Sequence, residues 1–281
     1  MRLASFHGDD GIHVGIVEGE VLVDLGLADM SSLLAAGLDR VRPDAAAPRI
    51  PLTGVRLAPT VPHPPKFLAI GLNYAAHVAE SITEKPKAQL WFNKQTTCVT
   101  ATGEPIHVPR ASDRVDYEGE LAFVIGRPCR HVPADRAAEV IAGYTIVNDV
   151  SVRDWQRRSP TMTMGKSFDT HGPMGPWLVT PDEVGDPHAL HLRTWVNDEL
   201  RQDASTSDLI FNCFAMVEHL STAFTLLPGD VISTGTPAGV AAAMDPPPWL
   251  RAGDVVRVEI ENIGTLENPV IDEPASTATL G

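Results

Sequence analysis

Residues 115–121 read VDYEGEL, and the arguments on both fold and function begin from this stretch. Side chains of a β-strand alternate between its two faces, so Glu118 and Glu120 are expected to point the same way. Gly119 between them allows another group to approach the backbone closely. Two like charges entering the apolar run LAFVI repel each other unless a cation lies between them. The stretch is therefore either a cation-binding strand or an edge strand with a solvated acidic face.

The composition is that of a globular protein with a large acidic excess. Of 281 residues 43% are hydrophobic, and 22 Lys and Arg stand against 36 Asp and Glu, giving a formal net charge of −14. The chain is long enough to bury a large core. Its negative charge argues against a nucleic-acid partner. An anionic substrate would have to be attracted by a metal ion or by local cations.

The three cysteines, Cys98, Cys129 and Cys213, have no CxxC or zinc-like spacing, so the sequence predicts neither a disulfide framework nor a thiolate metal site. Free thiols are typical of a reducing compartment. The N-terminus lacks the apolar core of a signal peptide, and no window approaches ~18 uncharged apolar residues. We expect a cytoplasmic protein that does not associate with membranes.

The first part of the chain is predicted to be a small α+β unit. Residues 2–25 alternate short apolar runs with turn residues, as in a β-meander with turns at Asp10-Gly11 and near Gly19. The segment MSSLLAAGL predicts a short helix closed by Gly37. Residues 42–66 are proline-rich and predict an extended linker. We place a small N-terminal domain and linker at 1–64 and a catalytic domain at 65–281.

The second part is predicted to be mainly β, with a few helices. Buried strands are expected from residue 67 to a turn at Gly71 and at 144–147, and short strands at 90–94, 98–102 and 105–109. A hairpin is expected to turn at Asn197-Asp198 and to pair RTWV with ELRQ. Helices are expected at 73–81 with Asn73 as N-cap, at 134–142 with Gly143 as the break, and at 209–224.

A third carboxylate, Asp149, follows the buried run YTIV and is expected at the end of a strand. Together with Glu118 and Glu120 it offers only oxygen ligands, which suit a hard cation such as Mg²⁺ or Mn²⁺. Three protein ligands leave positions for water and substrate, as in a catalytic site. Alternatively, Asp149 is a turn residue that caps the segment RDWQRR.

Other residues are candidates for the same site. Lys166, in a Gly/Pro-rich loop, would balance the carboxylates and polarise a carbonyl. Arg153 and Gln156 follow Asp149 closely enough to line one pocket. His77 and Glu80 are three residues apart and share one side of a helix, so that Glu80 would orient His77 as a base for water. The alternative is an exposed His–Glu pair on a solvated helix.

Seven segments together resemble the fumarylacetoacetate hydrolase family, in the branch of acylpyruvate hydrolases and 2-hydroxyhepta-2,4-diene-1,7-dioate isomerases. They are GLNYAAHVAE, DYEGELAFVIG, AGYTIVNDVSVRDWQ, GKSFDTHGPMGPW, NDELRQDASTSDLIF, PGDVISTGTPAGV and GDVVRVEIENIGTLENPV, in order between residues 71 and 270. The resemblance implies a mixed β-sandwich roll after a small N-terminal domain, and a homodimer.

The resemblance also implies roles for single residues. Metal ligands, for Mg²⁺ or Mn²⁺, match Glu118, Glu120 and Asp149, and a His–Glu pair on a lid matches His77 and Glu80. Substrate contacts match Arg153, Gln156, Lys166 and Thr236, and Lys94 matches a lysine near the site in some members. Met162 departs from the pattern, because relatives often carry an aromatic residue there.

Members of the family act on small 2-oxo acids or 1,3-dicarbonyl compounds. The expected function is therefore divalent-metal-dependent hydrolysis of a C–C bond in an acylpyruvate, of the fumarylacetoacetate or fumarylpyruvate type, with His77, Glu80 and Lys166 as catalytic residues. The alternatives are an oxo-acid decarboxylase or dienoate isomerase of aromatic catabolism, an oxaloacetate decarboxylase, and a non-catalytic binder of oxo acids.

Overall fold

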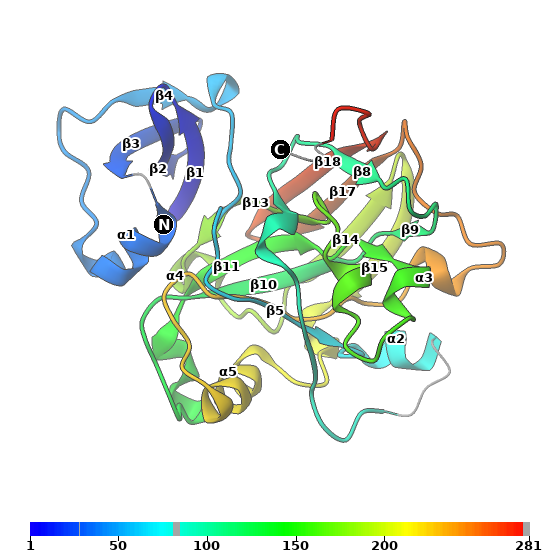
Figure 1. Cartoon of the computed structure of the whole chain (residues 1–281). Helices are drawn as coiled ribbons and strands as arrows, with labels where there is room; N and C mark the ends of the chain where they lie inside the picture. Colours follow the sequence, from blue (N-terminus) through cyan, green and yellow to red (C-terminus); the bar gives the residue numbers. More distant parts are fainter. Residues whose placement is uncertain (28, 81–84, 278–281) are drawn as a thin grey trace.

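The computed structural model of the chain describes all residues except 28, 81–84 and 278–281, and it is mainly β, as predicted (Figure 1). The largest sheet contains the N-terminal meander and residues 119–121 of VDYEGEL; residues 115–116 form a strand of another sheet, and residues 117–118 lie between the two strands, so the expected single strand is interrupted. The strands of the largest sheet, in spatial order, are β4 (Arg49–Pro51), β3 (Val21–Leu27), β2 (Gly11–Glu18), β1 (Arg2–Gly8), β13 (Gly172–Val179), β11 (Ile141–Asn148), β10 (Gly119–Ile125), β16 (Val231–Ser233), β5 (Phe67–Gly71) and β6 (Leu90–Asn93), with β7 (Val99–Thr100) also paired to β13.

Two smaller sheets complete the β structure. One has the order β15 (Glu199–Ser205), β14 (His191–Val196), β17 (Val255–Ile260), β18 (Gly264–Asp272) and β8 (Ile106–Val108). The other pairs β9 (Val115–Asp116) with β12 (Ser151–Val152). The predicted hairpin forms β14 and β15, where Val196 pairs with Glu199 and Thr194 with Gln202 across a register shift.

The helices are short, and α5 (Cys213–Ala223) and α1 (Met30–Ala36) contribute residues to the core on opposite faces of β10. The others are α2 (Ala75–Glu80), α3 (Arg153–Gln156) and α4 (Pro181–Val184), together with the 3-10 helices η1 (Leu38–Arg40), η2 (Leu52–Gly54), η3 (Thr96–Cys98), η4 (Ala134–Val140), η5 (Thr163–Lys166), η6 (Thr206–Asp208) and η7 (Ala241–Ala243). None of the helices in the described part of the chain is long and apolar enough to cross a membrane.

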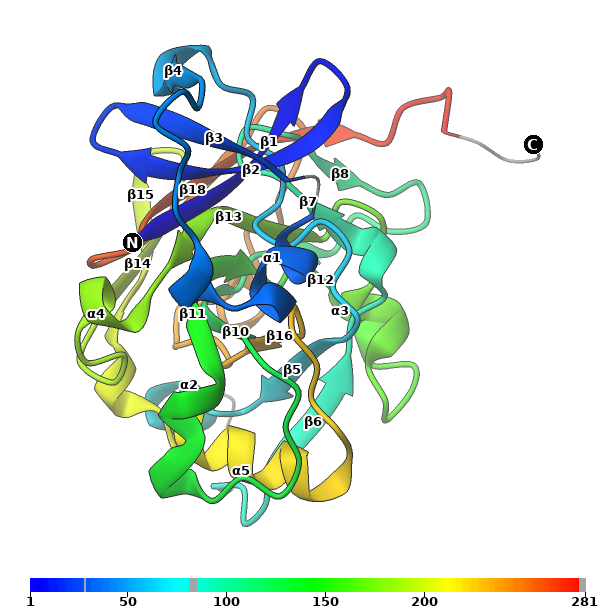
Figure 2. The same ribbon diagram turned by 90° about the vertical axis from the view of Figure 1, so that its left-hand side faces the viewer.

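Strand β10 is buried on both faces, and its alternation divides the core in two. Leu121, Phe123 and Ile125 pack into a cluster with residues of α5 and of β14 and β17. Ala122 and Val124 pack on the other face, into a cluster that includes residues of α1. Two views of the molecule that differ by a 90° turn both place α5 at the opposite end from β1–β4 (Figures 1 and 2). Strand β10, which contains Glu120 and directly follows Glu118, is therefore central to the molecule.

The N-terminal unit forms as predicted, apart from its linker. β1 and β2 turn at Asp10, β2 and β3 turn at Gly19, and α1 ends at Gly37, whose φ is +96°. The proline-rich segment contains a strand that was not expected: β4 pairs with β3. β1 also pairs with β13, so the meander extends the main sheet. The domain boundary at residue 64 stays a prediction.

Three local predictions were wrong. Asn73 is not the N-cap of α2, because its side chain binds the backbone of Phe211 and Thr234 instead. Ser81, the expected end of that helix, lies outside the described residues. Residues 134–140 form a 3-10 helix, and Gly143 lies inside β11 and does not break the chain. Helix α5 begins only at Cys213, because Asn212 caps it by accepting a hydrogen bond from the backbone of Ala215.

Candidate active site

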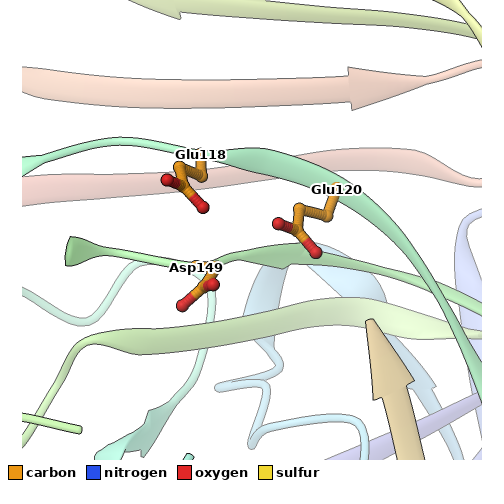
Figure 3. Close-up of side chains that lie close together, drawn as sticks. All are labelled: Glu118, Glu120 and Asp149. Carbon is orange, nitrogen blue, oxygen red and sulfur yellow. The ribbon is translucent and has the colours of Figure 1, made fainter. Parts of the chain in front are cut away.

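Three buried carboxylates come together at the ends of β10 and β11. One oxygen each from Glu118, Glu120 and Asp149 lies within 4.8 Å of the others, and all three side chains are buried. Figure 3 shows Glu118 and Glu120 extending from one segment toward the neighbouring segment that carries Asp149. Asp149 does not cap α3, whose N-cap residue is Val152. The two alternatives, a solvated acidic face for the glutamates and a helix cap for Asp149, are therefore wrong, and the residues form one cluster.

Backbone contacts hold the cluster together. The Asp149 amide donates to the Glu118 carbonyl at 2.8 Å, and the Glu118 amide donates to Asn148 Oδ1 at 3.0 Å. Glu120 Oε2 accepts the Gly235 amide at 2.9 Å and the Ser233 hydroxyl. Since β16, which ends at Ser233, pairs with β10, the sheet itself positions these donors.

Two buried lysines pair with the carboxylates. Lys166 Nζ lies 2.6 Å from Glu118 Oε2 and 2.7 Å from Asp149 Oδ2. Lys94 Nζ lies 2.6 Å from Asp149 Oδ1 and also donates to the Lys166 carbonyl. Gly165 makes this approach possible, because a Cβ there would lie 2.1 Å from the backbone nitrogen of Gln156. Close packing against the backbone of Gln156 therefore requires glycine at the position before Lys166.

Arg153 connects the cluster to a fourth carboxylate. Its Nη1 lies 2.6 Å from Glu118 Oε1 and donates to Gln156 Oε1 at 3.0 Å. Its Nε and Nη2 both lie 2.8 Å from Asp116 Oδ2. Asp116 is fully buried and also accepts backbone N–H groups from Tyr117, Ala241 and Ala242. Asp116 therefore fixes the direction in which the guanidinium points.

The surroundings of the two glutamates shift their pKa values in opposite directions. Burial alone would raise the pKa of Glu118, but Lys166 and Arg153 outweigh it and lower the pKa to about 2. Burial and the charges of Asp149 and Glu118 raise the pKa of Glu120 well above its usual value. Within the part of the chain that the structure describes, Glu120 forms no salt bridge and binds neutral donors. Glu120 is the carboxylate that still needs a cation.

His77 and Glu80 form the pair expected on α2. His77 Nδ1 lies 3.2 Å from Glu80 Oε2, and the Gly239 amide donates to Glu80 Oε1 at 3.0 Å. Gly239 has a φ of +103°, and a Cβ there would lie 1.9 Å from the Arg201 carbonyl. The side chains are 13% and 25% exposed, so the alternative of a freely solvated pair is wrong. Through its hydrogen bonds to His77 and Gly239, Glu80 connects helix α2 to the loop at residues 235–240.

A cavity of about 210 Å³ contains most of the predicted site residues. The polar residues that line it are His77, Glu118, Glu120, Arg153, Gln156, Lys166 and Thr236. Thr236 donates to the Gly119 carbonyl at 3.0 Å and accepts from Gln202. Lys94 does not line the cavity; its ammonium is fully buried beside Asp149. The structure therefore places Lys94 behind the carboxylates, away from the position of a substrate contact.

Residues 66–271 match the model of the fumarylacetoacetate (FAA) hydrolase C-terminal family. The chain belongs to the fumarylacetoacetate hydrolase family. Three solved structures are similar over nearly the whole chain. The fumarylacetoacetate hydrolase of Exiguobacterium antarcticum is 35% identical with a TM-score of 0.88, covering 97% of this chain and 100% of that one.

The other two relatives carry out different reactions by their names. The 2-hydroxyhepta-2,4-diene-1,7-dioate isomerase of Mycobacterium marinum is 38% identical, with a TM-score of 0.81 and coverage of 97% and 99%. The maleylpyruvate hydrolase of Sphingobium sp. SYK-6 is 33% identical, with a TM-score of 0.79 and coverage of 98% and 100%. That structure contains manganese(II) and pyruvate. The chain is thus a family enzyme whose relatives include hydrolases and isomerases.

The cluster fits a divalent cation. Its donors are carboxylate oxygens, which Mg²⁺ and Mn²⁺ prefer. A second indication is that Glu120 is buried and, among the described residues, has neutral donors and no salt bridge, because a buried ionised carboxylate needs a counter-charge. Glu118, Glu120 and Asp149 would hold the ion.

Sequence reasoning missed Asp116 and the donors to Glu120. Asp116 is two residues before Glu118, and the same alternation that selected the two glutamates extends back to it. Ser233 and Gly235 had no such signal, because their role depends on the pairing of β16 with β10. The predicted site residues could be recognised from local patterns and from the family resemblance. The donors to Glu120 can be recognised only from the tertiary structure.

Proposed function

We propose that this enzyme is a Mg²⁺- or Mn²⁺-dependent hydrolase of acylpyruvates. It cleaves the C–C bond that joins the acyl carbonyl carbon to the methylene group of the pyruvate part. The observation that carries the proposal is that His77 lines one small cavity together with Glu118 and Glu120, two of the three clustered carboxylates, while Asp149 lies directly beside them. A base and a cation-binding site on either side of a substrate are what hydrolysis of a β-dicarbonyl compound needs. The likeness to a maleylpyruvate hydrolase that holds manganese and pyruvate supports it.

When bound, a divalent cation supplies Lewis-acid polarisation of the substrate's 2-oxo group. The protein's own residues do the remaining work. Lys166, Lys94 and Arg153 balance the charge of the carboxylates and keep them in place. Gln156 and Thr236 line the cavity and orient the oxygens of the substrate by hydrogen bonding.

His77 is the proposed base. With Nδ1–H donating to Glu80, Nε2 is the nitrogen left to accept a proton. His77 takes a proton from water, and the remaining hydroxide oxygen bonds to the distal carbonyl carbon. The bond from this carbon to the methylene then breaks, and its electron pair stays on the pyruvate fragment as an enolate. His77 returns a proton, and the products are a carboxylic acid and pyruvate.

The rival reaction on this site is isomerisation or decarboxylation of an oxo-diacid, which the likeness to the Mycobacterium marinum isomerase favours. Isomerisation moves a proton and incorporates no water. Hydrolysis in H₂¹⁸O places one labelled oxygen in the released acid. We expect acetylpyruvate with Mn²⁺ to give labelled acetate and pyruvate; pyruvate-free tautomerisation of the substrate would contradict the hydrolase proposal.

The role of the His–Glu pair is tested by Glu80→Gln. Losing the carboxylate that orients His77 should lower kcat by about 10–100-fold, while Mn²⁺ affinity stays unchanged because Glu80 is outside the cluster. The matched control is Glu139→Gln, an exposed glutamate paired with Arg136. An unchanged kcat in Glu80→Gln would remove the pair from the mechanism.

A further inference from the structure

We propose that the acyl end of the substrate is uncharged and apolar, so that the natural substrate is a monocarboxylic acylpyruvate and not an oxo-diacid. The proposal rests on the hydrolase function above, in which the 2-oxo carboxylate lies at the carboxylate cluster. That cluster is the buried end of the cavity, since Glu118 and Glu120 are at most 5% exposed. The opposite end therefore decides which acyl group fits.

Of the lining residues that reach solvent, four form an apolar wall, and His77 and Gln156 are the partly exposed polar ones; the wall consists of Gly71, Leu72, Leu90 and Met162. Leu90 is 41% exposed, which places it at the opening. Leu90 and Met162 both lie close to Gly71, since a Cβ added there would be 3.4 Å from Leu90 Cδ2 and 3.8 Å from Met162 Cε. Gln156 Nε2 lies 3.6 Å from Met162 Sδ and so holds the methionine in the wall.

No free cation is available for a second carboxylate among the described residues that line the cavity. Its two permanent cations, Arg153 and Lys166, are each paired with two protein carboxylates. Residues 81–84, outside the described part, are Ser, Ile, Thr and Glu by sequence. Lys85 and Lys87 are exposed and do not line the cavity.

A distal carboxylate would therefore lose water without gaining a counter-ion, which is unfavourable. An alkyl group of the same shape gains contact with the wall. The volume of about 210 Å³ is below the ~300–1,000 Å³ usual for drug-sized ligands, so the acyl chain is short. Burial, charge and size all favour a short alkyl acyl group.

The test compares two substrates that differ at one position. Butyrylpyruvate and succinylpyruvate have the same chain length, and the terminal methyl of the first is a carboxylate in the second. With Mn²⁺-loaded enzyme we expect kcat/KM for butyrylpyruvate to be higher by at least about tenfold. Equal values, or a preference for succinylpyruvate, would overturn the proposal.

A variant then asks whether the wall causes the preference. Leu90→Arg adds a cation at the mouth, on an exposed position of the edge strand β6, and should narrow or reverse the preference by at least about tenfold. Leu200→Arg adds the same charge on β15, 47% exposed and outside the cavity, and should change nothing. An equal shift in both variants, or none in Leu90→Arg, would contradict the role of the wall.

Failure of the hydrolase proposal is distinguishable from failure of this one. If neither acylpyruvate is cleaved, calorimetry with the Mn²⁺-loaded protein compares 2-oxohexanoate with 2-oxoadipate, a pair that again differs only by methyl against carboxylate. Tighter binding of 2-oxohexanoate by at least about tenfold would support the apolar mouth even without hydrolysis. Equal or tighter binding of 2-oxoadipate would refute it.

Discussion

At the scale of single residues, the carboxylates illustrate what a local pattern can predict. The two-residue period of a strand predicted that Glu118 and Glu120 lie together, and they do, although Glu118 directly precedes β10 and only Glu120 lies within it. The same period left Asp116 unnoticed, since a carboxylate just before a strand is usually solvated. Its burial depends on the chain at Ala241 and Ala242, far away in sequence.

Asp116 gives a prediction for stability. Asp116→Asn leaves the buried Arg153 with its charge only half compensated, and breaking a buried ion pair costs about 3–5 kcal/mol of unfolding free energy. The control is Glu139→Gln, which removes an exposed ion pair with Arg136 and should leave the unfolding free energy nearly unchanged. Urea denaturation measures both. Equal losses of unfolding free energy in the two variants would contradict a stabilising role of the buried pair of Asp116 and Arg153.

At the scale of elements, strands were predicted more accurately than the segments that join them. The apolar runs of β10 and β11 contain several β-branched and aromatic residues, so the sequence predicted strands there. Gly143 was misread as a break because glycine usually interrupts regular structure. In β11 it has a packing reason: a Cβ there would lie 2.4 Å from the Val179 carbonyl on β13. Such a close approach between strands is a tertiary property that no local pattern contains.

The corresponding prediction concerns Gly143→Ala. The added methyl forces β11 and β13 apart, and overpacking of this kind costs about 1–3 kcal/mol. Gly54→Ala, where an added Cβ meets nothing within 4 Å, should change stability by less than about 1 kcal/mol. Thermal unfolding followed by circular dichroism compares the two. A Gly143→Ala protein as stable as the control would contradict the packing argument.

At the scale of the whole molecule, the sequence predicted the fold class and most residues of the cavity, largely through motifs spread over the chain. What it lacked was the arrangement that assembly creates: Lys94 behind Asp149, β1 paired to β13, and the apolar mouth at Leu90 and Met162. Each depends on two segments meeting that are distant along the chain. The predicted homodimer and the boundary at residue 64 stay predictions.

One pH effect belongs to the whole molecule, because it acts on global unfolding. Burial lowers the pKa of His171 from 6.5 to about 3, and its Nε2 binds the His107 carbonyl at 2.8 Å. An unfolded chain takes up the proton near 6.5, so the stability due to neutral His171 is complete above that pH and is lost as the pH falls toward 3. The expected slope is about 1.4 kcal/mol per pH unit.

His171→Gln tests this expectation, since glutamine does not titrate. Its unfolding free energy should fall less steeply than that of the wild type between pH 6.5 and 4, and His191→Gln, at a surface position beside Asp203, should follow the wild type. Chemical denaturation at several pH values gives the slopes. Parallel curves for His171→Gln and the wild type would contradict the assignment.

The central claim is that Glu118, Glu120 and Asp149 hold one divalent ion, and titration of metal-free protein with Mn²⁺, followed by electron paramagnetic resonance, tests it most directly. We expect one Mn²⁺ per chain, and Glu120→Gln should weaken its binding by at least about tenfold while the exposed Glu267→Gln does not. Wild-type protein that binds no Mn²⁺, or a folded Glu120→Gln variant that binds it equally tightly, would contradict the claim.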